Sequence, residues 1–192
     1  MTSERLGALA DALAARPRLV LPPAGKTAAA VLVPLFPVGE DAHLLFTRRS
    51  NDLTHHRGQV AFPGGRHHPA EDTDLQATAL REAREEIGLE PARVRLLGVL
   101  DDIETVSSGF VITPFVGVVP YPYPWTPHPG EVDAIFSVPI RVLLEPDAER
   151  QELWDFGGQQ VPIETFPVDG HVIWGATQRI TRNLLDVLAT LP

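Results

Sequence analysis

Residues 74–87 carry the strongest helix signal in this 192-residue sequence, and this segment constrains the fold more than any other. Thr73 and Gln76 stand in capping-box register, and Gly88 follows at the position where a left-handed residue commonly ends a helix. An apolar stripe recurs at helical spacing, at Leu80, Ala83 and Ile87. We therefore expect a helix with one face against a core.

The other edge of this helix carries an unusual cluster of carboxylates. Residues 81–86, REAREE, hold Glu82, Glu85 and Glu86, which share an arc of about 100° on a helix. Charged runs of this kind usually form a solvated face of ion pairs. Two features argue against that reading. Glu82 and Glu86 are like charges four residues apart, and the glutamates crowd the C-terminal end, where the helix dipole favours cations.

A hard divalent cation would account for this arrangement. Mg²⁺ takes oxygen ligands, commonly one or two carboxylates together with water and substrate phosphates. Upstream, Gly64 and Gly65 in FPGG form a turn without side chains, where a main-chain carbonyl can approach a metal. An ordinary turn at the end of a strand has the same composition, so the two glycines alone leave both interpretations open.

Composition excludes several other kinds of site. The 16 basic and 25 acidic residues give a net charge of −9, which disfavours nucleic acid and anionic membranes as partners. The chain has no cysteine, so disulfides, thiolate metal sites and cysteine nucleophiles are excluded. The first residues lack the apolar core of a signal peptide, and no apolar run approaches the roughly 20 residues that span a bilayer. We expect a cytoplasmic protein.

The rest of the chain predicts a mixed α/β (α+β) fold with a central mixed sheet. Residues 1–27 read as an N-terminal helix and a proline-rich connector packed on a main domain, residues 28–192. Apolar runs at 28–36 and 43–50, joined by turn residues, predict a hairpin. Further elements are a broken strand at 59–65, strands at 93–100 and 110–120, a proline-rich loop at 120–130, a strand running into a short helix at 134–145, a strand at 171–177 and a terminal helix at 177–191.

The segment GGRHHPAEDTDLQATALREAREEIGL resembles the Nudix box, which has Gly, five residues, Glu, seven residues, then Arg-Glu-apolar-x-Glu-Glu-x-Gly-apolar. Gly65 and Glu71 have the first spacing, and the second half is matched by Arg81, Glu82, Ala83, Glu85, Glu86, Gly88 and Leu89. Nine residues separate Glu71 from Arg81, two more than in the pattern. Asp72 and Asp74 are therefore alternatives to Glu71.

A longer stretch, LLFTRRSNDLTHHRGQVAFPGG at 44–65, is similar to the additional signature of the coenzyme A pyrophosphatase branch of that family. The matching residues are Thr47, Arg49, Ser50, Gly58, Phe62, Pro63, Gly64 and Gly65. Phe46 replaces a leucine, and Thr54 stands where the signature has an arginine, with Arg57 three residues on. The chain's HVIWGATQRITRNLL segment also resembles the closing strand and helix of that branch.

The resemblance implies an α/β/α sandwich and a hydrolase that cleaves the pyrophosphate of coenzyme A to 4′-phosphopantetheine and 3′,5′-ADP with Mg²⁺ or Mn²⁺. It implies Glu82 and Glu86 as direct metal ligands and Glu85 as a ligand or a water-mediated partner. A main-chain carbonyl of Gly64 or Gly65 would complete the shell, and Arg81 would orient the glutamates by bidentate pairing.

Other roles follow from the same resemblance. Arg48, Arg49 and Arg57 are candidates for holding substrate phosphates, with Gly64 close to the substrate. The general base is a glutamate of the box or Glu131, which follows the proline-rich loop. The alternatives are a Nudix hydrolase for ADP-ribose or NADH, and a catalytically silent module that binds a nucleotide. The sequence does not fix the oligomeric state, and a homodimer is left open.

Overall fold

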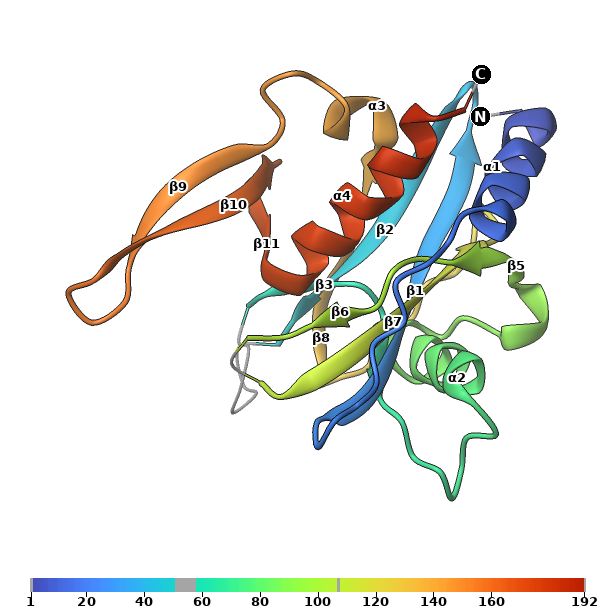
Figure 1. The fold of residues 1–192 in the computed structure, drawn as a ribbon. Coiled ribbons are helices and arrows are strands. Elements are labelled where there is room, and N and C mark those ends of the chain that lie inside the picture. Colours follow the sequence, from blue (N-terminus) through green and yellow to red (C-terminus); the bar gives the residue numbers. More distant parts are fainter. Residues whose placement is uncertain (1, 51–57, 107, 192) are drawn as a thin grey trace.

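The computed structural model describes residues 2–50, 58–106 and 108–191. Within these ranges the main sheet contains β1 (Thr27–Val38), β2 (Asp41–Arg49), β3 (Val60–Ala61), β4 (Gly64–Arg66), β5 (Arg95–Val99), β6 (Ile103–Glu104), β7 (Phe110–Val118) and β8 (Val132–Pro139). Its central order is β3-β2-β1-β7-β5, while β4 also pairs with β1, β6 with β7 and β8 with β2 (Figure 1). β1 runs parallel to β7 and antiparallel to β2, so the predicted mixed sheet is confirmed.

The expected hairpin between residues 28–36 and 43–50 is also confirmed, as β1 and β2. The two strands pair only near the turn, from Leu35 opposite Leu44 to Val38 opposite Asp41. Farther back, the same edge of β1 pairs with the short strand β4. β2 thus diverges from β1 and pairs along its length with β8, and β4 is inserted beside β1.

Helices cover both faces of this sheet. Alternate residues of a strand point to opposite faces. On β1, Ala30 and Leu32 pack in one core with α2 (Leu75–Ile87). Val33 and Leu35 belong to a second core shared with α1 (Ser3–Ala15) and α4 (Gly175–Ala189). The predicted α/β/α sandwich is therefore confirmed, and α2, the helix with the glutamates, lies alone against its face.

The helix boundaries differ slightly from those expected. The cap of α2 is Asp74, whose carboxylate accepts a hydrogen bond from the Ala77 amide at 2.7 Å, rather than Thr73. Its buried stripe is Ala79, Ala83 and Ile87, while Leu80 is only half-buried. Residues four apart lie on one face of a helix, so these three side chains form a single buried row.

A second sheet lies outside the main one, in the order β11-β10-β9, and the sequence did not indicate two of its strands. It consists of β9 (Arg150–Asp155), β10 (Gln160–Val168) and β11 (His171–Trp174). The strand predicted at 171–177 ends at Trp174, because α4 begins at Gly175. Figure 1 shows the β9–β10 hairpin projecting away from the rest of the molecule. The remaining elements are α3 (Ile140–Leu143) and the short 3₁₀ helix Pro91–Arg93.

The N-terminal segment packs against the main sheet. Leu6, Leu9 and Leu13 of α1 are buried in the core that contains α4. The connector after α1 is held by ion pairs from Arg16 to Asp101 at 2.9 Å and from Arg18 to Asp102 at 3.2 Å. The division between residues 1–27 and 28–192 stays a prediction. None of the helices in the described ranges has the length and apolarity needed to cross a membrane.

Candidate functional site

The short strand β4 before α2 brings main chain close to the glutamates. Gly64 and Gly65, which we expected to form a turn, begin this strand because they pair with β1; we call this chain segment the Gly64–Gly65 turn. Gly64 and Gly65 of β4 lie opposite Val31 and Ala30 of β1. A Cβ built on Gly64 would stand 2.4 Å from the Ala30 carbonyl oxygen, and one on Gly65 would stand 2.6 Å from the carboxyl carbon of Glu82. Both distances are far below van der Waals contact. Each position therefore needs glycine, Gly64 for the sheet and Gly65 for the approach of Glu82.

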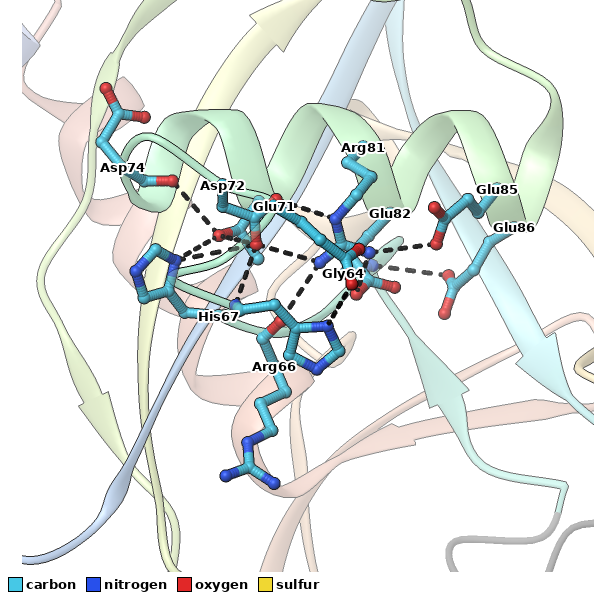
Figure 2. A network of polar contacts seen from close by, with 12 residues as sticks. Gly64, Arg66, His67, Glu71, Asp72, Asp74, Arg81, Glu82, Glu85 and Glu86 are labelled. Atoms are coloured by element: carbon cyan, nitrogen blue, oxygen red, sulfur yellow. Dashed lines mark hydrogen bonds and ion pairs between the residues drawn. The ribbon is translucent and has the colours of Figure 1, made fainter.

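The three glutamates of α2 have different surroundings. Glu86 is 4% exposed, and its Oε2 lies 3.4 Å from the Gly64 amide, which donates to it. Glu82 is half-buried against Gly65. Glu85 is exposed, and its carboxylate accepts a hydrogen bond from Arg81 at 3.0 Å. The structure thus brings Glu82 and Glu86 to the Gly64–Gly65 turn and leaves Glu85 at the rim (Figure 2).

The two inner carboxylates lack sufficient positive charge around them. Burial raises the pKa of Glu86 to about 8, although the Arg49 guanidinium, 4.0 Å away, acts in the opposite direction. Burial also raises the pKa of Glu82, even though Arg81 pairs with it at 2.8 Å. Buried carboxylates are costly unless they are paired or bind a metal. A cation between Glu82 and Glu86 would supply the missing charge.

The donor set fits a hard divalent cation with few protein ligands. In the part of the chain that the structure describes, no group of three or more histidine, aspartate or glutamate side chains is gathered closely enough to hold a metal. Two carboxylates and a main-chain carbonyl beside a side-chain-free turn suit Mg²⁺ or Mn²⁺, because such ions keep several sites for water and phosphate. The assignment of Glu82, Glu86 and Gly65 as ligands stays a prediction.

We expected Arg81 to make a bidentate contact with the glutamates. It makes its bidentate contact with Asp72 instead. Its Nε donates to Oδ1 of Asp72 at 2.8 Å and its Nη2 to Oδ2 at 3.1 Å (Figure 2). The remaining Nη1 reaches Glu82 at 2.8 Å and Glu85 at 3.0 Å, and Nη2 also donates to the Arg66 carbonyl. Arg81 therefore connects the loop before α2 to the glutamates.

The acidic residue in the lengthened loop that pairs with Arg81 is Asp72 rather than Glu71. Asp72 is 5% exposed and accepts further hydrogen bonds from the His68 amide and the Thr78 hydroxyl, at 3.0 and 2.9 Å. Its hydrogen bonds from Arg81 are the main reason why its pKa is held well below the usual range. Glu71 is 62% exposed, and its carboxylate lies 3.9 Å from the ring of the exposed His68. The longer loop thus moves the acidic partner by one residue.

Of the three arginines proposed for phosphate binding, the two described ones, Arg48 and Arg49, do not lie on the same face of β2. Arg49 faces Glu86, on the side of the sheet that α2 covers. Arg48 is its neighbour in β2 and points to the opposite face, where its buried Nε has no hydrogen-bond partner among the described residues. Arg57 and Thr54 lie outside the described residues. The described part of the chain therefore places one of these arginines, Arg49, at the glutamates.

The proline-rich loop at 120–130 forms the wall at the C-terminal end of α2. The amides of Thr126 and His128 donate to the carbonyls of Ile87 and Glu86, at 3.1 and 2.9 Å. These contacts satisfy carbonyl groups that a helix end leaves without partners. Glu131 follows the loop, and its carbonyl accepts from the Ser50 amide at 2.8 Å. Its side chain is exposed and lies 3.8 Å from the His128 ring. After burial, the main cause, the charge of Glu131 is a minor contribution to the raised pKa of both Glu82 and Glu86.

Other residues of the longer sequence signature support the frame of the site. Thr47 and Ser50 are buried, and the Thr47 hydroxyl donates to the Ala61 carbonyl at 3.2 Å. Phe62 stacks on Phe46 with ring centroids 4.8 Å apart. The Pro63 carbonyl accepts from the Leu32 amide at 2.8 Å and so ties the glycine turn to β1. Through these contacts with β1, β2 and β3, the signature residues fix the position of the Gly64–Gly65 segment.

Comparisons with known proteins bear on the family and the fold of the chain. The family model described as NUDIX domain matches residues 26–156. The chain is similar to the uncharacterized Nudix hydrolase NudL of Photorhabdus laumondii, with 39% identity over 81% of this chain and 82% of that protein. It is 33% identical to the uncharacterized NudL of Salmonella paratyphi B, over 92% of this chain and 91% of that protein. Among solved structures, the Nudix hydrolase RenU of M. smegmatis is similar with a TM-score of 0.59 and 18% identity, over 87% of this chain and 88% of that one.

Proposed function

The chain belongs to the Nudix family, and we propose that it hydrolyses the pyrophosphate of coenzyme A and its derivatives to 4′-phosphopantetheine and 3′,5′-ADP. The observation that carries the proposal is the placement of Glu82 and Glu86 against the Gly64–Gly65 turn. Two carboxylates with raised pKa values beside bare main chain are suited to gather a divalent cation and an anionic diphosphate.

Nudix hydrolases generally use divalent metal ions, and Glu82, Glu86 and a carbonyl of Gly64 or Gly65 would hold the ion here. When bound, Mg²⁺ or Mn²⁺ supplies the positive charge that lets carboxylates and pyrophosphate approach each other. Glu85 adds a water-mediated contact at the rim. Arg81, fixed by Asp72, keeps Glu82 in position through its 2.8 Å contact.

The reaction adds one water across the P–O–P bridge. The water oxygen forms a bond to one phosphorus, the bridging P–O bond breaks, and the bridging oxygen leaves with the other phosphate. Glu131 is our candidate to accept the proton of the attacking water, because it is an exposed carboxylate on a separate loop whose charge is felt by Glu82 and Glu86. A glutamate of α2 is the alternative base.

The preference for coenzyme A is supported by the signature at 44–65 and its arginines. The 3′-phosphate of coenzyme A needs a cationic partner, and arginine pairs well with phosphate. Arg49 is placed at the site by β2. Arg57 stays a candidate phosphate contact from the sequence, although it lies outside the described residues. Arg48 points away from the glutamates, so no phosphate contact is assigned to it in this proposal.

The proposal is tested by incubating the protein and Mg²⁺ or Mn²⁺ with coenzyme A, ADP-ribose and NADH in parallel, with products identified by mass spectrometry. We expect 4′-phosphopantetheine and 3′,5′-ADP from coenzyme A at a higher kcat/KM than for either other substrate. Rapid turnover of ADP-ribose with no turnover of coenzyme A would show that the substrate is another nucleoside diphosphate derivative. Nucleotide binding without turnover of any substrate would indicate a silent module.

Replacing Gly64 or Gly65 by alanine should have different effects, on stability in the first case and on activity in the second. Gly64→Ala pushes against the backbone of β1 and should cost about 2 kcal/mol of unfolding free energy, as overpacking does. Gly65→Ala meets only the flexible end of Glu82, so the fold should survive while kcat falls roughly tenfold or more, because Glu82 is displaced. Urea denaturation and steady-state kinetics on both variants separate these effects. The reverse pattern would contradict the assigned contacts.

A further inference from the structure

The strand β9 forms an open edge of the second sheet. In the described ranges β9 pairs with β10 alone, and the hairpin of these strands extends away from α4 and the main sheet (Figure 1). Exposed strand edges readily pair with another chain, and proteins usually protect them with charged side chains, proline, a bulge or a short length. The six residues of β9, RQELWD, contain neither proline nor lysine, and three of them, Arg150, Glu152 and Asp155, are charged. Its pairing with β10 shows no register shift.

The hydrogen-bonding groups on this edge can be assigned from the ladder with β10. The Phe156 amide donates to the Gln159 carbonyl at 2.9 Å, so these two form a hydrogen-bonded pair. Such pairs alternate with non-hydrogen-bonded pairs along antiparallel strands. Leu153 and Pro162, three positions farther along, are therefore a non-hydrogen-bonded pair, which suits a proline. The amide and carbonyl of Leu153 consequently point outward, away from β10.

Side chains beside these groups are apolar and exposed. Leu153 is 68% exposed, and Phe156, just beyond the strand, is also exposed. On the other face, which Phe156 shares by alternation, Trp154 packs against Trp174 of β11 with ring centroids 5.0 Å apart. The edge is therefore unpaired within the described residues and carries exposed apolar side chains on both faces.

We propose that the β9 edge is a self-association surface, on which β9 of a second copy of this chain pairs antiparallel about a two-fold axis at Leu153. This surface goes beyond the proposed catalytic function. A two-fold axis perpendicular to the sheet leaves each face of β9 on the same side of the joined sheet. Odd-numbered residues of one copy therefore lie opposite odd-numbered residues of the other, and even-numbered opposite even-numbered. With the axis at Leu153, the two Leu153 side chains meet and exchange outward backbone hydrogen bonds. Gln151 faces Asp155 of the second copy, and Arg150 faces its Phe156.

Side-chain charges favour this register over its neighbour. An axis at Glu152 would set two glutamates directly opposite each other, and like charges in that position destabilise a strand pair. The axis at Leu153 opposes no like charges. It places the second N–H of the Gln151 amide, whose first donates to Glu164, against the Asp155 carboxylate, which already accepts from Gly158 and Gln160. It also places the Arg150 guanidinium against the Phe156 ring. Both contacts occur twice, and the pairing joins the two hairpin sheets into one continuous sheet.

Analytical ultracentrifugation across a concentration series tests the surface with the 192-residue chain. We expect a concentration-dependent dimer for the wild type, and a dissociation constant at least tenfold higher for Leu153→Lys, which places two cations at the axis. Val20→Lys is the matched control, since Val20 is 63% exposed but lies in the connector after α1, and it should dimerise as the wild type does. A wild type that stays monomeric, or a Leu153→Lys variant that dimerises normally, would overturn the proposal. Equal melting temperatures exclude unfolding as the cause.

Single cysteines test the register, because the chain has no cysteine of its own. At the axis a hydrogen-bonded pair has Cα atoms about 5.5 Å apart, within disulfide range. The same residue one position away from the axis lies roughly 8 Å from its copy, beyond that range. Under mild oxidation Leu153→Cys should form a covalent dimer, while Glu152→Cys and Trp154→Cys should not. Cross-linking by Glu152→Cys, or equally by all three, would overturn the register.

Discussion

Glu86→Gln should lower kcat for coenzyme A at least a hundredfold, on the order of the electrostatic effects seen at such sites, while the protein stays folded. The substitution keeps the shape of the side chain and an oxygen that accepts from the Gly64 amide. It removes the charge that would hold the cation. Because burial raises the pKa of Glu86 to about 8, its ionised form opposes folding when no metal is bound. The metal-free variant should therefore melt no lower than the wild type.

Steady-state kinetics and thermal melting with and without Mg²⁺ measure both effects. Glu90→Gln is a matched control, since Glu90 is an exposed glutamate just beyond α2 that pairs only loosely with Arg84, at 3.8 Å. Its kcat should equal that of the wild type. Near-normal activity of Glu86→Gln at saturating metal would mean that this buried carboxylate serves only the packing of α2.

Asp72→Asn should cost about 3 kcal/mol of unfolding free energy, because it takes one charge from a buried, bidentate ion pair. It should also lower kcat roughly tenfold, as expected for a residue that positions others rather than touching substrate. Arg81 would keep its contacts to Glu82 and Glu85 but lose the anchor that sets its direction. Urea denaturation gives the first quantity and steady-state kinetics the second.

The neighbouring acidic residue provides the control for this prediction. Glu71→Gln should leave both stability and kcat unchanged, since Glu71 is exposed and makes only a loose pair with His68. A loss in Glu71→Gln as large as that in Asp72→Asn would show that the acidic partner of Arg81 had been placed one residue wrongly.

The effect of Asp72 should also depend on pH with a definite sign. Its folded-state pKa lies below the value of about 3.9 in the unfolded chain, so its contribution to stability is complete above that value. As pH falls further, the contribution is lost progressively toward the folded-state pKa. The stability difference between wild type and Asp72→Asn should thus be constant from pH 8 to about 5 and shrink below about 4. A difference that disappears by pH 6 would contradict the assigned cause.

The helix half of the site could be predicted from the sequence because its geometry is local. Once residues 74–87 are helical, the spacing of Glu82 and Glu86 sets their shared edge, and Gly88 adopts the left-handed conformation expected of it. The two strands of the first hairpin were likewise evident from their apolar runs. In each case neighbouring residues determine the outcome.

The parts that could not be predicted depend on contacts between distant residues. Whether Glu71 or Asp72 meets Arg81 depends on the path of a loop, which spacing does not determine. The β9–β10 hairpin was missed because its strands are largely exposed and lack a clear apolar alternation. Arg48 and Arg49 looked equivalent as phosphate contacts, but the pleat of β2 directs them to opposite faces.

The central claim is that Glu82 and Glu86 hold a divalent cation at the Gly64–Gly65 turn. Titration of Mn²⁺ into metal-free protein by isothermal titration calorimetry tests it without relying on turnover. We predict saturable binding to the wild type and to Glu90→Gln, and at least tenfold weaker binding to Glu82→Gln and Glu86→Gln. Equal Mn²⁺ affinity in all four proteins would contradict the account, because the ion would then bind elsewhere.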